Sequence, residues 1–135
     1  LVKPEAHLSP DAQLRRILQR LTGRLRCAAL TNNPTTVGRR TLAVLGVDDL
    51  LPAVIGLDLS GRSKPDWRPF ALAIDAIGCE VEQVLMIGDR WEVDCAPVVA
   101  RGGGAALVDE STSLEAIAEA IYDALDSASG SQSQR

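Results

Sequence analysis

The sequence lacks the features that would assign it to several special classes of protein. Its 135 residues contain no apolar run of about 20 residues, so neither membrane insertion nor export is indicated. The net charge of −4 is mild, and the arginines are scattered rather than gathered into a basic patch, so nucleic-acid binding is not expected. No internal repeat is evident. These absences leave an ordinary globular domain that is long enough to bury a core.

Cysteine and histidine are also scarce. Cys27, Cys79 and Cys95 show no CxxC spacing, which favours reduced thiols in a cytoplasmic protein over a disulfide scaffold. The single histidine, His7, lies far along the chain from Cys95, so a catalytic Cys/His pair is not indicated. The chain opens with Leu1 rather than methionine, which suggests a fragment, a processed product or an unusual start.

Apolar periodicity alternates between helical and extended stretches. Helices are predicted over residues 10–22, 34–45, 66–77, 94–101 and 113–125, and strands over residues 25–30, 54–57, 84–88 and 105–108. This alternation predicts an α/β fold with a doubly wound, mainly parallel sheet and right-handed crossovers. We expect a loose lead-in at residues 1–8, a core domain at 9–126 and a disordered tail at 127–135, where Ser, Gly and Gln dominate.

Two aspartates follow the most strand-like segment, Val84-Leu85-Met86-Ile87-Gly88. Asp89 comes directly after it, at the sheet edge where ligands bind in open α/β folds. Asp94 follows one loop later, near the expected start of the next helix. Two carboxylates in one small volume are hard oxygen ligands, so they favour a Mg²⁺ site completed by water and phosphate. The plainer interpretation is a turn carboxylate at Asp89 and a helix cap at Asp94.

Two further segments place polar residues at the same sheet edge. The strand over residues 25–30 ends at Thr31-Asn32, just before a helix, and a hydroxyl beside a helix N-terminus attracts anions. The alternative is an ordinary Thr/Asn cap. Lys64 precedes Pro65 and a helix, which restrict its direction, so its ammonium could neutralise a phosphate. The alternative is a lysine in solvent. The glycines 102–104 join a helix to a strand, so we interpret them as a turn rather than a phosphate loop.

These segments resemble, in order, three motifs of the haloacid dehalogenase-like (HAD) hydrolases. Thr31-Asn32 after a strand is similar to the second motif, Lys64-Pro65 to the third, and Gly88-Asp89 through Asp94 to the fourth, GDxxxxD. The resemblance covers roughly residues 9 to 125. It implies a Rossmann-like core of a Mg²⁺-dependent phosphatase acting on a small phosphorylated metabolite. It also implies that Thr31, Asn32 and Lys64 bind phosphate and stabilise charge, while Asp89 and Asp94 bind the metal.

The first motif of that family, the nucleophile segment DxDx(T/V), is absent from this chain. The nearest candidate, Asp58 in Leu57-Asp58-Leu59-Ser60, lies between the second and third motifs and cannot fill its place. Covalent catalysis needs that aspartate, so the chain is expected to be inactive alone. The family's first strand, normally central in the sheet, and the cap are missing as well. The strands ending at Thr31 and Asp89 should therefore pair directly, or accept a strand from a partner segment or a second copy.

Two alternatives use similar residues. One is a non-catalytic phosphate- or metal-binding or regulatory domain on the same fold. The other is a receiver-like phosphoacceptor domain, in which the acidic cluster precedes the threonine and lysine. In this sequence Asp89 and Asp94 follow Thr31 and Lys64, which disfavours the receiver-like alternative.

Overall fold

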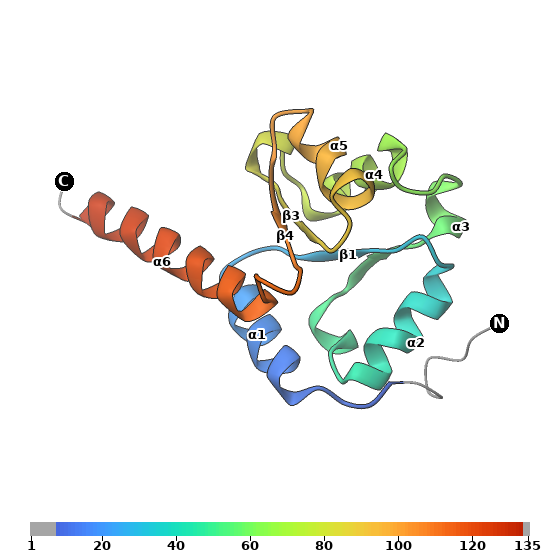
Figure 1. Ribbon diagram of the computed structural model, residues 1–135, viewed down its shortest axis with the longest axis horizontal. Helices are drawn as coiled ribbons and strands as arrows, with labels where there is room; N and C mark the ends of the chain where they lie inside the picture. Colours follow the sequence, from blue (N-terminus) through green and yellow to red (C-terminus); the bar gives the residue numbers. More distant parts are fainter. Residues whose placement is uncertain (1–7, 134–135) are drawn as a thin grey trace.

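The computed structural model describes residues 8–133, in which helices alternate with short strands (Figure 1). The major elements are α1 (Ala12–Thr22), β1 (Ala28–Leu30), α2 (Thr35–Leu45), β2 (Ala53–Ile55), α3 (Leu57–Ser60), α4 (Trp67–Ile77), β3 (Leu85–Gly88), η4 (Trp91–Cys95), α5 (Ala96–Val99), β4 (Gly104–Leu107) and α6 (Leu114–Ser133). Short 3₁₀ turns, η2 (Asp48–Leu50) and η3 (Val81–Gln83), precede β2 and β3. The lead-in predicted for residues 1–8 lies outside the described residues except for Leu8.

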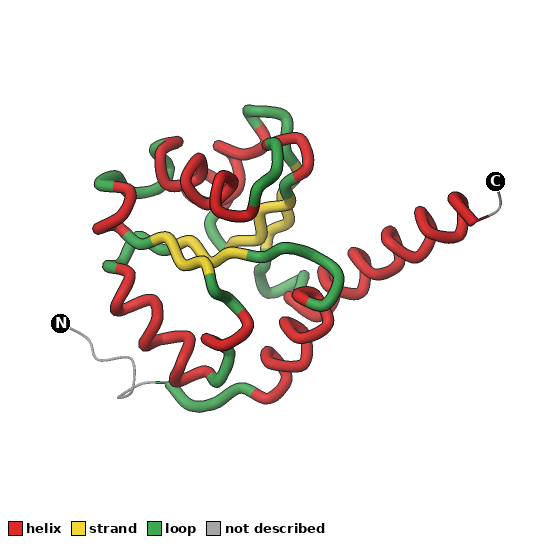
Figure 2. Tube along the Cα trace, turned by 180° about the vertical axis from the view of Figure 1, so that it is seen from behind, coloured by secondary structure: helices red, strands yellow, loops and turns green. Residues whose placement is uncertain are grey.

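The strands pair in parallel, as the alternating pattern predicts. β1 lies beside β2 with Ala29 opposite Val54, and β3 lies beside β4 with Met86 opposite Ala105. Within residues 8–133 these pairs are two separate two-stranded sheets, visible as two yellow groups in Figure 2. The direct pairing of β1 with β3, one of the two expected outcomes, does not occur. A strand must lie within about 4.8 Å of its neighbour to share hydrogen bonds, and these two strands stay apart.

Helix ends follow local capping chemistry. The Asp11 carboxylate accepts a hydrogen bond from the backbone N–H of Leu14 at 2.9 Å and so caps α1. Asp66 caps α4 by accepting from Arg68 N at 2.9 Å. Because Asp66 caps the helix directly after Lys64-Pro65, the start of α4 sets the position of that loop.

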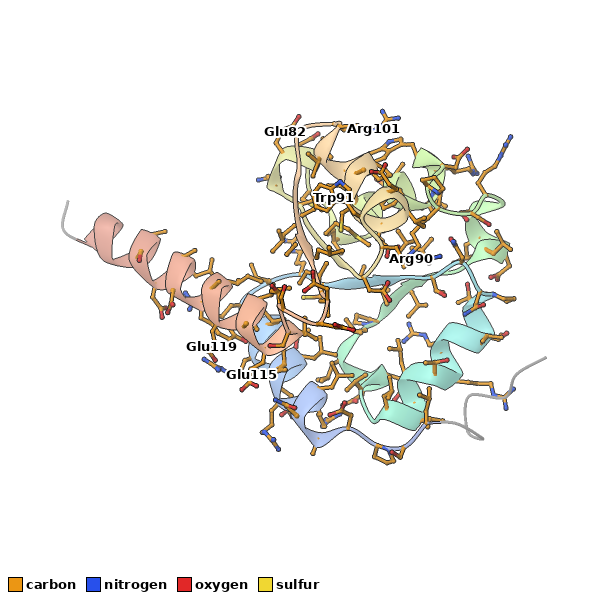
Figure 3. All side chains as sticks on the ribbon, in the orientation of Figure 1. Glu82, Arg90, Trp91, Arg101, Glu115 and Glu119 are labelled. Atoms are coloured by element: carbon orange, nitrogen blue, oxygen red, sulfur yellow. The ribbon has the colours of Figure 1, made fainter. Side chains whose placement is uncertain are left out.

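Helices α1 and α6 pack through a small apolar cluster. Leu21 of α1 meets Ala118 and Tyr122 of α6, and all three are buried. Charged contacts surround this cluster, including Arg20 with Glu119 at 2.9 Å and Gln13 with Glu115 at 2.6 Å; both glutamates are labelled in Figure 3 at the α1–α6 junction. This packing attaches the C-terminal helix to the first helix of the domain.

Helix α6 is longer than the sequence pattern suggests. We expected it to end near Leu125 and a disordered tail to follow, but the helix continues to Ser133. The prediction of disorder is therefore wrong for residues 127–133, and residues 134–135 lie outside the described range. The first turn of a helix is unfavourable to form, and packing against α1 stabilises that turn of α6. Each further residue then adds one backbone hydrogen bond at little cost in free energy. The end of α6 projects away from the body of the protein (Figure 1). None of the helices in residues 8–133 has the length and apolar character needed to cross a bilayer.

The glycines between α5 and β4 form a turn, as expected. Gly102 adopts a φ of 96°, which favours glycine. A Cβ at Gly103 would lie 2.5 Å from Val98 Cγ1 and 2.7 Å from the backbone oxygen of Val81, whereas a Cβ at Gly104 would meet its nearest atom, Leu85 Cδ1, at 3.5 Å. The turn thus needs glycine at position 103 because two chain segments approach it closely.

We expect Gly103→Ala to lower the free energy of unfolding by about 1–3 kcal/mol, because the backbone of Val81 must move to admit the methyl group. Gly104→Ala is the matched control, since its methyl group enters ordinary van der Waals contact. Urea denaturation of the two variants and the unmodified protein measures the difference. Equal stabilities for the two variants would contradict the close packing described for Gly103.

Candidate functional site

A buried ion pair links the loop before α4 to the turn after β3. Lys64 Nζ lies 2.6 Å from Asp94 Oδ1, and the two side chains are only 8% and 4% exposed. Lys64 belongs to the loop before α4, which packs on β1 and β2, while Asp94 lies in the turn after β3. The pair therefore forms where the ends of the two sheets come together, as predicted for these residues.

Asn32 holds the backbone of Lys64. Its Oδ1 accepts from Lys64 N at 2.8 Å, and its Nδ2 donates to Lys64 O at 3.5 Å. Lys64 Nζ also donates to the carbonyl oxygen of Leu30, at 3.5 Å. The Lys64–Pro65 peptide bond is cis. The Asn32 side-chain amide thus positions Lys64.

Asp94 reaches Lys64 from the middle of a π-helical turn, η4, rather than from a helix start as expected. The turn brings Asp94 back to Arg90, whose N–H donates to Asp94 Oδ2 at 3.1 Å; Arg90 is labelled in Figure 3. Gly88 makes room for it, because a Cβ at position 88 would lie 2.4 Å from Asp94 Cβ. The absence of a side chain at Gly88 is therefore a condition for the position of the carboxylate.

The charge state of Asp94 follows from its contacts. Burial acts to raise the pKa of Asp94, but the hydrogen bond and the positive charge of Lys64, with smaller contributions from Arg90, outweigh it and hold the pKa below its usual range. Burial raises the pKa of the neighbouring Cys95 thiol, and the negative charges of Asp94 and Asp89 raise it further. At neutral pH the site thus contains a carboxylate paired with an ammonium, beside an inert thiol.

Thr31 and Asp89 lie at the ends of β1 and β3. Thr31 N donates to Ile55 O at 3.0 Å, and Thr31 Oγ1 accepts from Asn33 N at 3.1 Å, which leaves the hydroxyl hydrogen for another acceptor. The Asp89 side chain is exposed, directly after Gly88. Thr31 and Asp89 thus flank the buried Lys64–Asp94 pair.

The order of these residues matches a known family. A family profile described as haloacid dehalogenase-like hydrolase matches residues 3–98. The chain belongs to this family. Among curated relatives, a phosphoglycolate phosphatase of Rhodospirillum rubrum is 32% identical over 103 residues, covering 73% of this chain and 42% of the relative. A phosphoglycolate phosphatase of Cereibacter sphaeroides is 40% identical over 85 residues, covering 63% of this chain and 38% of the relative. The matched part of the chain thus covers less than half the length of these relatives.

Solved structures share the fold of this HAD-like chain. A putative beta-phosphoglucomutase from Thermotoga maritima has a TM-score of 0.65 at 20% identity, covering 82% of this chain and 52% of that one. A HAD phosphatase from Thermococcus onnurineus has a TM-score of 0.59 at 24% identity, covering 70% of this chain and 44% of that one. These neighbours confirm the Rossmann-like α/β class expected from the sequence.

The donor set of the HAD-like site is sparse for a metal ion. Asp89 and Asp94 offer hard carboxylate oxygens of the kind that Mg²⁺ prefers. Within the part of the chain that the structure describes, no group of three or more His, Cys, Asp or Glu side chains could hold a metal ion. Two carboxylates alone are a sparse donor set, so a metal ion bound here would need most of its ligands from water or another molecule.

Sequence patterns could not reveal the role of Asp58. Its Oδ1 accepts from Thr35 N at 2.6 Å and from Thr35 Oγ1 at 2.8 Å, so it caps α2 from the first turn of α3. The exclusion of Asp58 as a nucleophile agrees with this structural use of the carboxylate. No local signal links two residues so far apart in the sequence.

We expect Lys64→Met to lower the free energy of unfolding by on the order of 3 kcal/mol, because it leaves the Asp94 carboxylate buried without its cation. The double variant Lys64→Met with Asp94→Leu should recover much of this loss. Arg24→Met is the control, since it breaks the exposed Arg24–Asp126 pair and should cost about 1 kcal/mol or less. Equal losses for Lys64→Met and Arg24→Met in chemical denaturation would contradict the importance of burial.

The stabilising effect of Asp94 should depend on pH. Because its folded-state pKa is depressed, its contribution is fully present above the unfolded pKa of about 4 and is lost as pH falls through the folded value. The difference in unfolding free energy between the unmodified protein and Asp94→Asn should therefore be constant near neutral pH and shrink in acid. Denaturant titrations across this pH range measure it, and a difference that grew in acid would contradict the assigned ion pair.

Proposed function

We propose that this chain is the phosphate- and Mg²⁺-binding core of a HAD-like phosphatase, a phosphate monoester hydrolase, and that it is inactive alone because the nucleophile aspartate is missing. The observation that carries the proposal is the buried Lys64–Asp94 pair, at 2.6 Å, between the ends of β1 and β3. A buried ammonium beside two strand ends supplies positive charge where an anion can approach. The support is the position of these groups together with the family membership.

In this proposal each side chain has one task. The Thr31 hydroxyl and the Lys64 ammonium bind the phosphoryl oxygens. Asn32 orients Lys64 through its two backbone hydrogen bonds, at 2.8 and 3.5 Å. Asp89 and Asp94 would hold Mg²⁺, which when bound would offset the negative charge of the phosphate. Arg90 keeps the Asp94 carboxylate in place through its backbone N–H.

The missing step is formation of the aspartyl-phosphate. No DxDx(T/V) segment occurs in the sequence, and Asp58 is engaged with Thr35. The residues present can therefore bind and neutralise a phosphate but cannot attack it. The missing strand would come from a partner segment or a second copy of the chain, but the aspartate would have to come from a partner segment, because the chain itself has no DxDx(T/V). We propose a small phosphorylated metabolite as substrate, in line with the phosphoglycolate phosphatases among the relatives. We propose the cytoplasm as location, in line with the three cysteines that lack CxxC spacing.

The absence of a nucleophile also supports a second candidate, a non-catalytic domain that binds phosphate or metal and regulates a partner. The two candidates differ in what a supplied nucleophile would do. Adding DxDx(T/V) on a strand should restore hydrolysis in the first candidate and should have no effect on hydrolysis in the second.

We expect the 135-residue chain to show no hydrolysis of p-nitrophenyl phosphate in the presence of Mg²⁺. A version extended at its amino end by a strand carrying DxDx(T/V) should be active, and Asp89→Asn in that version should abolish turnover. Ser111→Ala, in the loop after β4, is the control that should leave the extended version active. Robust hydrolysis by the short chain, abolished by Asp89→Asn, would overturn the account of the missing nucleophile.

A further inference from the structure

The side chain of Arg90 lies beside the Lys64–Asp94 pair and has no task in the proposed chemistry. Arg90, labelled in Figure 3, comes directly before η4, and its Nε lies 3.9 Å from Asp94 Oδ2. Lys64 Nζ contacts the other oxygen of the same carboxylate, Oδ1, at 2.6 Å. The two cations therefore flank one carboxyl group, each at a different oxygen.

The two cations differ in their exposure to solvent. The side chains of Lys64 and Asp94 are 8% and 4% exposed, whereas the side chain of Arg90 is 57% exposed. Lys64 is thus the inner cation of the site and Arg90 is the outer one.

Most of the hydrogen-bonding capacity of Arg90 is unused. A guanidinium carries five N–H donors in a planar fork. Arg90 faces Asp94 through Nε, at a distance too long for a hydrogen bond, and within residues 8–133 neither Nη1 nor Nη2 donates to another residue. By comparison, Arg39 Nη1 donates to Leu51 O at 2.6 Å. The terminal nitrogens of Arg90 are therefore available to a ligand.

The anchoring of Arg90 keeps these nitrogens close to the site. The backbone N–H of Arg90 donates to Asp94 Oδ2 at 3.1 Å, so the carboxylate that attracts its side chain also holds its backbone. With Nε facing Asp94, the two terminal nitrogens form the free end of the fork. That end matches a second carboxylate, which accepts two parallel N–H···O bonds from it.

We propose that Arg90 determines substrate specificity by binding a carboxylate of the substrate while Lys64 binds its phosphoryl group. Because the two cations contact the two oxygens of one carboxyl group, a short molecule is enough to reach both. The substrate class is therefore a small phosphorylated carboxylic acid, in which a short carbon chain joins the two acidic groups. A hydroxyl or alkyl group in place of the carboxylate would leave the fork of Arg90 without a charged acceptor.

This inference rests on the proposed function, because it takes Thr31 and Lys64 as the groups that bind the phosphoryl oxygens. It adds the recognition of the part of the substrate that hydrolysis leaves unchanged.

Phosphonoacetate and ethylphosphonate are matched probes, because one carries a carboxylate where the other carries a methyl group and neither contains a phosphate ester. In NMR titrations of the full chain with Mg²⁺, phosphonoacetate should bind roughly fivefold more tightly, the effect of one exposed ion pair. Arg90→Met should remove this preference and leave the affinity for ethylphosphonate unchanged. Arg90→Lys, which keeps the charge but not the fork, should retain part of the preference.

The Nε–H signal of Arg90 gives a direct readout in the unmodified chain, so it tests the contact even where a variant fails to fold. It should shift with phosphonoacetate and stay in place with ethylphosphonate. Arg16→Met on α1 and Arg62→Met in the loop before Lys64 are the controls, since each removes an exposed arginine. Neither should change the ratio of the two affinities.

Three outcomes would overturn the inference and leave the proposed function standing. They are equal affinities of the unmodified chain for the two probes, loss of the preference in Arg62→Met but not in Arg90→Met, and equal weakening of both probes in folded Arg90→Met, which would assign Arg90 to the phosphoryl group. Binding of neither probe by the unmodified chain would overturn the proposed function and the inference together.

Discussion

The contact between Lys64 and Asp94 is the interaction on which the arrangement of this site depends. Removing two charges from water is costly, and the cost is recovered only when the geometry is close and the remaining polar atoms have partners. The structure meets both conditions, because the two groups are 2.6 Å apart, the ammonium also donates to Leu30 O, and the carboxylate also accepts from Arg90 N. Strand β1 of the first pair and strand β3 of the second pair both end next to this contact.

This dependence explains why several neutral residues matter as much as the charged ones. Asn32 holds the Lys64 backbone, and Gly88 leaves the space that Asp94 occupies. Asp58 holds the start of α2 through Thr35, directly after the Thr31–Asn33 loop. The loops after β1, β2 and β3 are thus tied to one another by side-chain hydrogen bonds, although the strands belong to separate sheets.

The sequence predicts much of the fold because its local signals agree. Apolar runs such as Leu85–Gly88 mark the strands, Asp66 marks the start of α4, and the parallel arrangement follows from the alternation of helices and strands. It also identifies Lys64 and Asp94 as residues that should converge. It could not show that Asn32 serves the lysine, because that contact joins residues 32 positions apart and leaves no periodic trace. The continuation of α6 escaped prediction because composition favours disorder, while packing against α1 nucleates the helix.

The missing side chain at Gly88 has a consequence for how this protein tolerates change. Thr31 and Asp89 lie at strand ends where a different side chain meets loop or solvent, so the fold can survive their replacement even where ligand binding does not. Position 88 differs, because any side chain there would occupy the place of the Asp94 Cβ. A single added methyl group would clash with the Asp94 side chain and displace its carboxylate from the lysine. Gly88, which has no functional group, is therefore the residue of this segment with the fewest acceptable substitutes.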